Sequence, residues 1–395
     1  MQLEAKFPLY NRAGYLKAQL SGEARYFSFL PSPLQSITLN GLDDSFYFLM
    51  AQTRHQIGVL DVLSSRIPNM DLFISMYVRK EALLSSQIEG TQATLDDILD
   101  PQAERNRNLN VAEVINYIKA VHHALDRLGK LPLCIRLLRE THGILLAGNR
   151  GGEKAPGEFR RTQNWIGPGG STIKTASFVP PAPEDLAPAL DDLERFINDD
   201  IPLTAEFAVD PLIKAALIHY QFETIHPFLD GNGRMGRLLI ILYLCEKKLL
   251  SKPALYISCF LKQNQAEYYN RLSEVRRRGS YEQWIHFFIR GIKDTTEDAI
   301  GAIEQMTALR ERNTGRIAAL GRSAKTARKL YDYIERNPII EIGKTAEDLD
   351  LSFNTAAKAV NHLTTLNILR PTADAKRNRC FAYEDYLAIL RKDTE

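Results

Sequence analysis

The spacing of apolar residues along the chain predicts a mainly helical protein. From residue 44 to about residue 300, apolar side chains return every three or four positions, which is the period of an amphipathic α-helix. The pattern is clear in residues 72–90 (LFISMYVRKEALLSSQIEG), 111–129 (VAEVINYIKAVHHALDRLG) and 190–199 (LDDLERFIND). We therefore expect a helical core in the middle of the chain.

Two stretches depart from the helical pattern. Residues 1 to about 50 are rich in aromatics and prolines, which predicts an irregular arm with little regular structure. In NWIGPGGSTIKTASFVPP, which begins at residue 164, short β-prone runs flank a Gly/Pro turn. This arrangement predicts a β-hairpin over about 164–179, set inside the helical region.

The composition changes again near residue 320. The tail reads as a helix, a short helix, a turn, a longer helix and a basic hairpin-like stretch, an order that resembles a winged helix-turn-helix. Its recognition helix would be NTAAKAVNHLTTL, with groove contacts from Lys358, Asn361 and His362. The wing would carry Lys376, Arg377 and Arg379 toward phosphates. Residues 321–395 hold 13 Lys or Arg against 11 Asp or Glu, and this net charge of +2 makes DNA binding less favoured than dimerisation or target docking.

Length and composition set the frame for these elements. A chain of 395 residues is too long for one simple core, so we expect an N-terminal arm and helical region (1–70), a core (71–300) and a C-terminal domain (320–395). The net charge of +2 gives no strong attraction to nucleic acid or membrane. Four scattered cysteines without a C-x-x-C pair argue against a zinc site or a disulfide framework. Without a signal-peptide core or a membrane-length apolar run, the expectation is a cytoplasmic protein.

One short loop, HPFLDGNGRMGR at residues 226–237, gathers the residue types needed to hold an anion and act on it. Pro227 disfavours helical geometry at His226, so the preceding helix should end there, and a second helix should resume around Met235. Glycines that lead into a helix N-terminus let backbone N–H groups approach a phosphate. Arg234 and Arg237 add fixed positive charge.

The same loop offers a metal ligand and a base. Asp230 suits Mg²⁺, which prefers one or two carboxylates together with phosphate oxygens. His226 has an imidazole that can accept a proton near neutral pH. An isolated H-x-x-x-D or G-N-G is more often structural than catalytic, and only the complete string favours chemistry.

The complete string resembles the signature of the Fic family, H-x-F-x-[D/E]-G-N-G-R-x-x-R. The resemblance implies an all-α Fic core over roughly residues 70–300 and transfer of AMP from ATP to a Ser, Thr or Tyr hydroxyl of a protein. It makes His226 the base, Asp230 the Mg²⁺ ligand, and Arg234 and Arg237 the ligands of the β- and γ-phosphates. The nucleotide-binding set is completed by Gly231, Asn232, Gly233, Met235 and Gly236.

The resemblance also assigns two regions outside the loop. The hairpin at about 164–179 would be the flap, which pairs with an extended target segment through main-chain bonds and so presents its hydroxyl. The segment EYYNRL resembles the part of the family beside the nucleotide base, which would place Tyr268, together with Tyr269, against it. Paired tyrosines on a helix are at least as often packing residues.

A second string, SSQIEG at residues 85–90, resembles the family's inhibitory motif [S/T]-x-x-x-E-[G/N]. On a helix over about 72–90, Ser85 and Glu89 share one face, and Gly90 is suited to end the helix. A Glu89 carboxylate at Arg237 would neutralise the charge needed by the γ-phosphate. The resemblance therefore implies an autoinhibited enzyme, with self-modification when the inhibition is released.

Several alternatives stay open from the sequence. Fic relatives also transfer phosphate or phosphocholine, and a nucleotide-sensing DNA-binding regulator is a reading from a different class. The identity of the target, a role of Glu89 in removing AMP, the specificity for adenine and a homodimer are not decided by these residues.

Overall fold

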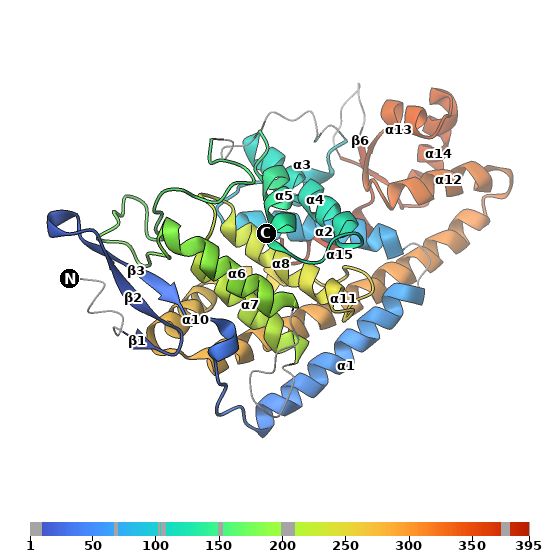
Figure 1. Cartoon of the computed structure of the whole chain (residues 1–395). Helices are drawn as coiled ribbons and strands as arrows, with labels where there is room; N and C mark the ends of the chain where they lie inside the picture. Colours follow the sequence, from blue (N-terminus) through green and yellow to red (C-terminus); the bar gives the residue numbers. More distant parts are fainter. Residues whose placement is uncertain are drawn as a thin grey trace.

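The computed structural model describes residues 10–66, 70–101, 103, 108–148, 153–198, 210–372 and 380–394. The described part is mainly helical, with two small antiparallel sheets, as the apolar periodicity predicts. Figure 1 shows a cluster of helices at the centre, one sheet near the N-terminus and the other among the C-terminal helices drawn in orange and red. Within the described residues, no helix is both long enough and apolar enough to cross a membrane.

The centre of the fold is a helix that is buried on all sides. Helix α7 (Pro211–Ile225) is buried from Leu212 to Ile225, its polar residues included. It packs against α8 (Asn232–Glu246), which follows in the chain, and against α6 (Leu186–Asn198). The short connection between α7 and α8 is the glycine-rich loop, so the loop rests on the most buried part of the molecule.

The other helices of the core surround this pair. Helix α1 (Asp44–Arg66) lies along α11 (Tyr281–Ala318), and the two form the long lower edge in Figure 1. Helix α11 continues past residue 300, the expected limit of the core. The remaining helices around the core are α2 (Met70–Ile88), α3 (Leu95–Leu99), α4 (Leu109–Leu128), α5 (Ile135–Leu145), α9 (Ser258–Gln263) and α10 (Gln265–Arg278).

The irregular N-terminal arm is a wrong prediction. The strands β1 (Tyr10–Asn11), β2 (Gly14–Gln19) and β3 (Tyr26–Pro31) form an antiparallel sheet in the order β1-β2-β3. Gly14 and Leu16 of β2 are buried, and Phe27 and Phe29 of β3 enter the core. The aromatic residues that suggested an irregular arm are therefore the inward face of a strand.

The hairpin predicted over 164–179 is reduced to one antiparallel bridge, between Ile166 and Phe178. Pro168 has no N–H to donate to a ladder, and a Thr172–Thr175 turn closes the stretch instead. The stretch is held from outside, because Phe29 of β3 donates its N–H to Val179 O at 2.9 Å. The N-terminal sheet thus supports the segment that the sequence predicts as a flap.

The C-terminal elements follow the predicted order of helix, short helix, longer helix and hairpin. They are α12 (Ala324–Ile334), β4 (Ile339–Glu341), α13 (Ile342–Asp348), α14 (Phe353–Thr365), β5 (Arg370–Pro371), β6 (Cys380–Ala382) and the additional helix α15 (Glu384–Arg391). The strands form a sheet in the order β4-β6-β5. Its identification as a winged helix-turn-helix stays a prediction. Lys376, Arg377 and Arg379 lie outside the described residues, whereas Lys358 and Asn361 are exposed on α14.

Candidate active site

The loop between α7 and α8 begins and ends at residues that its sequence explains. Helix α7 ends at Ile225 and His226 takes a left-handed conformation (φ 50°), so the predicted helix end is confirmed. Helix α8 begins at Asn232, three residues before the expected start at Met235. It begins early because Asn232 fixes the turn: its Oδ1 accepts the N–H of Phe228 at 2.9 Å and its Nδ2 donates to Phe228 O at 2.8 Å.

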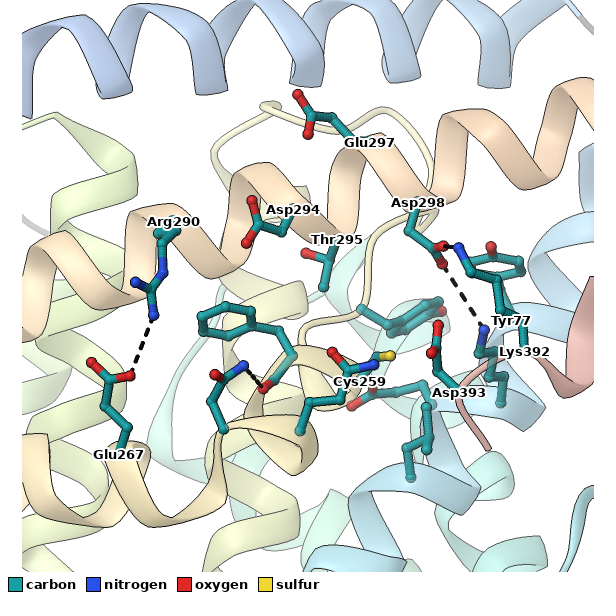
Figure 2. Close-up of a pocket in the computed structure, with 17 residues that line it drawn as sticks. Tyr77, Cys259, Glu267, Arg290, Asp294, Thr295, Glu297, Asp298, Lys392 and Asp393 are labelled. Carbon is teal, nitrogen blue, oxygen red and sulfur yellow. Dashed lines mark hydrogen bonds and ion pairs between the residues drawn. The ribbon is translucent and has the colours of Figure 1, made fainter. Parts of the chain in front are cut away.

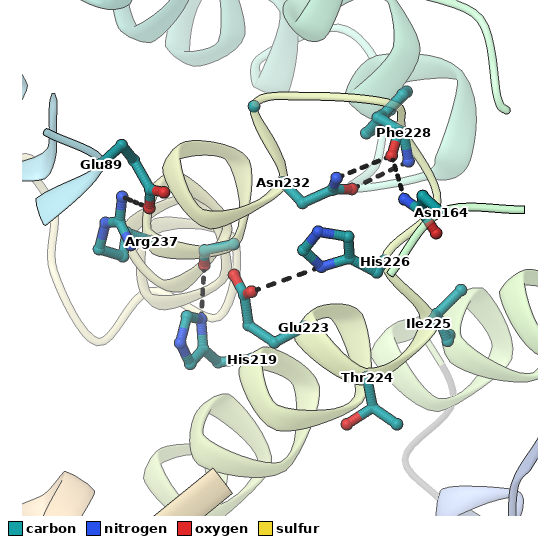
Figure 3. A network of polar contacts seen from close by, with 12 residues as sticks. Glu89, Asn164, His219, Glu223, Thr224, Ile225, His226, Phe228, Asn232 and Arg237 are labelled. Carbon is teal, nitrogen blue, oxygen red and sulfur yellow. Dashed lines mark hydrogen bonds and ion pairs between the residues drawn. The ribbon is translucent and has the colours of Figure 1, made fainter. Parts of the chain in front are cut away.

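His226 lies at the rim of the site with one fifth of its side chain exposed. Its Nδ1 has no hydrogen-bond partner among the described residues and faces Glu223 Oε2 at 4.0 Å (Figure 3). Burial, followed by the nearby charges of Arg276 and Arg160, lowers the pKa of His226 well below its usual value. The imidazole is therefore neutral at pH 7, the form that a general base requires.

Asp230 and Arg234 form the outer part of the loop. The Asp230 carboxylate is 45% exposed and lies 3.6 Å from the Arg234 guanidinium, and its Oδ1 accepts the N–H of Gly231 at 2.5 Å. Arg234 Nε and Nη1 are buried without a hydrogen-bond partner in the described part of the chain. Buried donors of this kind are costly unless a ligand satisfies them, so Arg234 fits an anion such as a phosphate.

The loop is supported by a histidine that sequence reasoning missed. His142 on α5 stacks on Phe228 with ring centroids 3.7 Å apart. The N–H of Gly157 donates to His142 Nδ1 at 2.9 Å, so Nε2 carries the proton and donates to Asp230 O at 3.0 Å. Burial lowers the pKa of His142 to about 4, which keeps this tautomer uncharged at neutral pH. No sequence signal separates His142 from an ordinary amphipathic-helix residue.

Arg237 is held by the predicted inhibitory segment. The guanidinium is buried, and its Nη2 donates to Glu89 Oε1 at 2.7 Å and to Ser85 O at 2.8 Å, while Nε donates to Ser85 Oγ at 2.8 Å. Figure 3 shows Glu89 reaching over Arg237 at the start of α8. Helix α2 ends at Ile88, so Glu89 lies in the turn after the helix, and Gly90 (φ +95°) completes that turn.

Glu89 also occupies the helix N-terminus where an anion would bind. A Cβ built on Gly233 would come within 2.2 Å of Glu89 Oε1, so the carboxylate lies directly against the first turn of α8. Backbone N–H groups and the helix dipole favour a negative group at this position. The carboxylate therefore occupies a position suited to phosphate.

The structure corrects several expected ligand contacts. Tyr268 is 1% exposed and its hydroxyl bonds His219 Nε2 at 2.9 Å, so it packs inside the core and cannot line a nucleotide base in this conformation. Tyr269 is 44% exposed. Met235 is fully buried and its N–H donates to Gly231 O, which makes it a packing residue of α8. The amide of Asn232 is engaged by Phe228, so this side chain shapes the loop.

A buried acid near the loop was also missed. Glu223 on α7 is 6% exposed, and its Oε1 has no hydrogen-bond partner among the described residues. A Cβ on Gly236 would lie 2.2 Å from this Oε1, so Gly236 leaves the space that the carboxylate occupies. The sequence signal was an acidic residue on a helix rich in apolar residues, three residues before His226.

A separate cavity of about 950 Å³ lies behind the inhibitory helix (Figure 2). Tyr77 and Lys80 of α2 line it together with Asp294 and Asp298 of α11 and with the chain end. Glu81 on the same helix face accepts hydrogen bonds from Ser258. No residue of the glycine-rich loop lines this cavity.

Comparison with known proteins agrees with the loop geometry. Residues 47–126 match the Fic/DOC family N-terminal region, and residues 132–244 match the Fic/DOC family. Two proteins named "Protein adenylyltransferase Fic", from Drosophila grimshawi and Drosophila melanogaster, are 32% identical over 200 residues, which is 50% of this chain and 34% of each relative. This chain thus spans about a third of the length of the curated relatives it matches.

The fold agrees as well. A crystal structure of a Fic family protein from Desulfovibrio desulfuricans G20 superposes with a TM-score of 0.55 at 20% identity, covering 88% of this chain and 97% of that one. This likeness shows a shared fold, and the family follows from the sequence matches. This chain therefore carries a Fic/DOC family domain at residues 132–244, preceded by the N-terminal region of that family at residues 47–126.

Proposed function

We propose that this protein is an autoinhibited protein adenylyltransferase, which transfers AMP from ATP to a Ser, Thr or Tyr hydroxyl of a target protein. The observation that carries the proposal is a neutral, rim-exposed His226 next to unsatisfied Arg234 donors at the N-terminus of α8. The relatives named as adenylyltransferases support AMP as the transferred group.

The proposed reaction joins the target hydroxyl oxygen to the α-phosphorus of ATP and breaks the bond from that phosphorus to the pyrophosphate. His226 takes the hydroxyl proton, and Arg234 and Arg237 bind the phosphates that leave. Asp230 would hold Mg²⁺, which supplies charge neutralisation on the phosphates when bound. Mg²⁺ is commonly held by one or two carboxylates together with phosphate oxygens, which fits the exposed Asp230 carboxylate.

The inhibited state follows from the contacts of Glu89. Arg237 has its donors directed to Glu89 and Ser85 and so lacks the free charge that a γ-phosphate needs. Rotating the Glu89 carboxylate out of the site would vacate both Arg237 and the first turn of α8. Activity in this proposal is therefore set by how often Glu89 leaves.

The target would dock along the segment 164–179. Asn164 ties this segment to the loop by donating to Phe228 O at 3.0 Å, so a chain paired with the segment would pass close to His226. Trp165 is 42% exposed there and offers an apolar contact to a target side chain. Pairing through the main chain would read little of the target's sequence.

ATP labelled at different phosphates tests which group is transferred. With the Glu89→Gly variant, Mg²⁺ and a cell lysate as the source of targets, label on the α-phosphate should appear in protein, whereas label on the γ-phosphate should not. Matched reactions with Glu89→Gly/His226→Ala control for other enzymes in the lysate. Transfer of the γ-label that depends on His226 would assign phosphate transfer instead and overturn the proposal.

A further inference from the structure

The side chains of Glu223 and His226 face each other at the end of α7. Glu223 and His226 are three residues apart, and the left-handed turn at His226 brings the imidazole back toward the helix (Figure 3). Glu223 Oε2 lies 4.0 Å from His226 Nδ1. Neither His226 Nδ1 nor Glu223 Oε1 has a hydrogen-bond partner among the described residues.

The gap between these two groups suits a direct contact. A water that bridges two groups at tetrahedral geometry needs them about 4.6 Å apart, since each hydrogen bond is about 2.8 Å long. At 4.0 Å the pair is too close for such a water. A small rotation of either side chain would instead bring the two atoms within hydrogen-bond distance.

The neighbouring cations leave the Glu223 carboxylate available for this contact. Arg237 directs its hydrogen bonds to Ser85 and Glu89. Arg276 donates to Thr224 Oγ1 and to the backbone oxygen of Glu223. Gly236 on α8 has no side chain, and this leaves the space that the Glu223 carboxylate occupies.

We propose that Glu223 is a positioning residue for His226. Its carboxylate accepts a hydrogen bond from Nδ1–H, so that Nε2 is the nitrogen that removes the target hydroxyl proton. This inference rests on the proposed function, because a general base requires a fixed tautomer. When Nε2 takes the proton, the Nδ1 proton stays in place and the carboxylate stabilises the imidazolium.

The contact gives the reaction a dependence on pH. Burial raises the pKa of Glu223 to about 7, while Arg237 and Arg276 oppose the rise and Glu89 adds to it. The ionised carboxylate is the form that accepts the hydrogen bond from Nδ1–H. The rate of AMP transfer should therefore rise with pH as Glu223 ionises. The titratable and charged groups around Glu223 come from several elements. They are Arg237 on α8, Arg276 and Tyr268 on α10, Glu89 after α2, His219 on α7 and His226 at the C-terminal end of α7.

Kinetics of AMP transfer test the role of Glu223 in the active Glu89→Gly background. Adding Glu223→Gln should lower kcat about 100-fold, the scale of a general-base contribution, with less than about a threefold change in the KM for ATP. It should also remove the acidic limb of the pH profile. Glu81→Gln is the matched control, since Glu81 is another buried glutamate whose pKa burial raises to about 7, and it should keep that limb.

A readout without catalysis separates this inference from the proposed function. The tautomer of His226 can be read from NMR spectra of protein with ¹⁵N-labelled histidine, where the His226 signal is assigned by its loss in His226→Ala. Above pH 8 the Glu89→Gly parent should carry the proton on Nδ1. Adding Glu223→Leu should remove this preference for the Nδ1 tautomer. A protonated Nε2 in the parent, or an unchanged kcat and pH limb in Glu223→Gln, would overturn the role of Glu223. If the parent makes no AMP product, the proposed function fails while the tautomer still tests Glu223.

Discussion

At the scale of single residues, the decisive feature is a charge that the fold buries and then pairs. Arg237 is 1% exposed, and a guanidinium taken from water at this depth needs a charged partner. Glu89 is the partner in this structure, and under the proposed function a phosphate would replace it in the active state. Inhibition and substrate binding would then satisfy the same buried arginine.

Thermal unfolding should report this exchange of partners. Glu89→Gly should unfold at a lower temperature than wild type without ligand, because Arg237 loses its counter-charge. ATP with Mg²⁺ should then raise the unfolding temperature of the variant more than that of wild type, since binding to the folded state stabilises it. As a control, Glu158→Gly removes an ion pair with Arg139 on the surface and should leave the ATP effect unchanged. Equal ATP effects in wild type and Glu89→Gly would contradict the exchange.

At the scale of elements, the site depends on how closely α7 and α8 approach. Gly236 on α8 lies against Glu223 and His219 of α7, and His219 Nδ1 donates to Gly236 O at 2.9 Å. This hydrogen bond leaves His219 Nε2 to accept from Tyr268, which links α7, α8 and α10. The position of the catalytic loop thus follows from buried polar contacts between helices as well as from apolar packing.

Gly236→Ala tests this close approach. The new Cβ would lie 2.2 Å from Glu223 Oε1 and 3.3 Å from His219 Cε1, so we expect a loss of about 1–3 kcal/mol in the free energy of unfolding measured with denaturant. Gly301→Ala on α11 is the matched control, because its Cβ meets nothing within 4 Å. The control should gain about 0.5–1 kcal/mol from helix propensity. A Gly236→Ala variant as stable as wild type would show that the helices can separate freely.

The sequence predicts the site better than its surroundings. The helix end at His226 follows from Pro227, and the approach of Glu89 to Arg237 follows from the motif resemblance. The N-terminal sheet was missed because its aromatic residues lie among prolines, and only pairing between β2 and β3 gives them an inward face. Tyr268 and Glu223 could not be placed, since the packing of α10 and α8 against α7 decides whether a polar side chain on a helix is buried.

At the scale of the whole molecule, the chain end braces the inhibitory region. Arg391 of α15 makes two hydrogen bonds to Asp96 on α3, of 2.9 and 2.8 Å. The oxygen of Thr394 lies 3.5 Å from Gln87 Nε2 on α2, and Lys392 pairs with Asp298 beside the cavity behind α2. The C-terminal elements are therefore in contact with the helix that carries Ser85.

Reversing one charge at the chain end should loosen this brace. Arg391→Glu would face Asp96 and Glu384, so we expect faster amide hydrogen exchange in residues 83–88 of α2 and a modest rise in AMP transfer with Glu89 intact. Lys130→Glu, which reverses an exposed pair with Asp126, is the control and should change neither quantity. Unchanged exchange in α2 would mean that the chain end does not restrain the inhibitory helix.

Intact-protein mass spectrometry after incubation with ATP and Mg²⁺ tests the central claim most directly. Wild type, Glu89→Gly and Glu89→Gly/His226→Ala are compared under one set of conditions, and self-modification serves as the readout. We predict an added AMP mass on Glu89→Gly, little on wild type and none on the double variant. An equal adduct on all three would contradict the assigned roles of Glu89 and His226, and an adduct of a different mass would contradict AMP transfer.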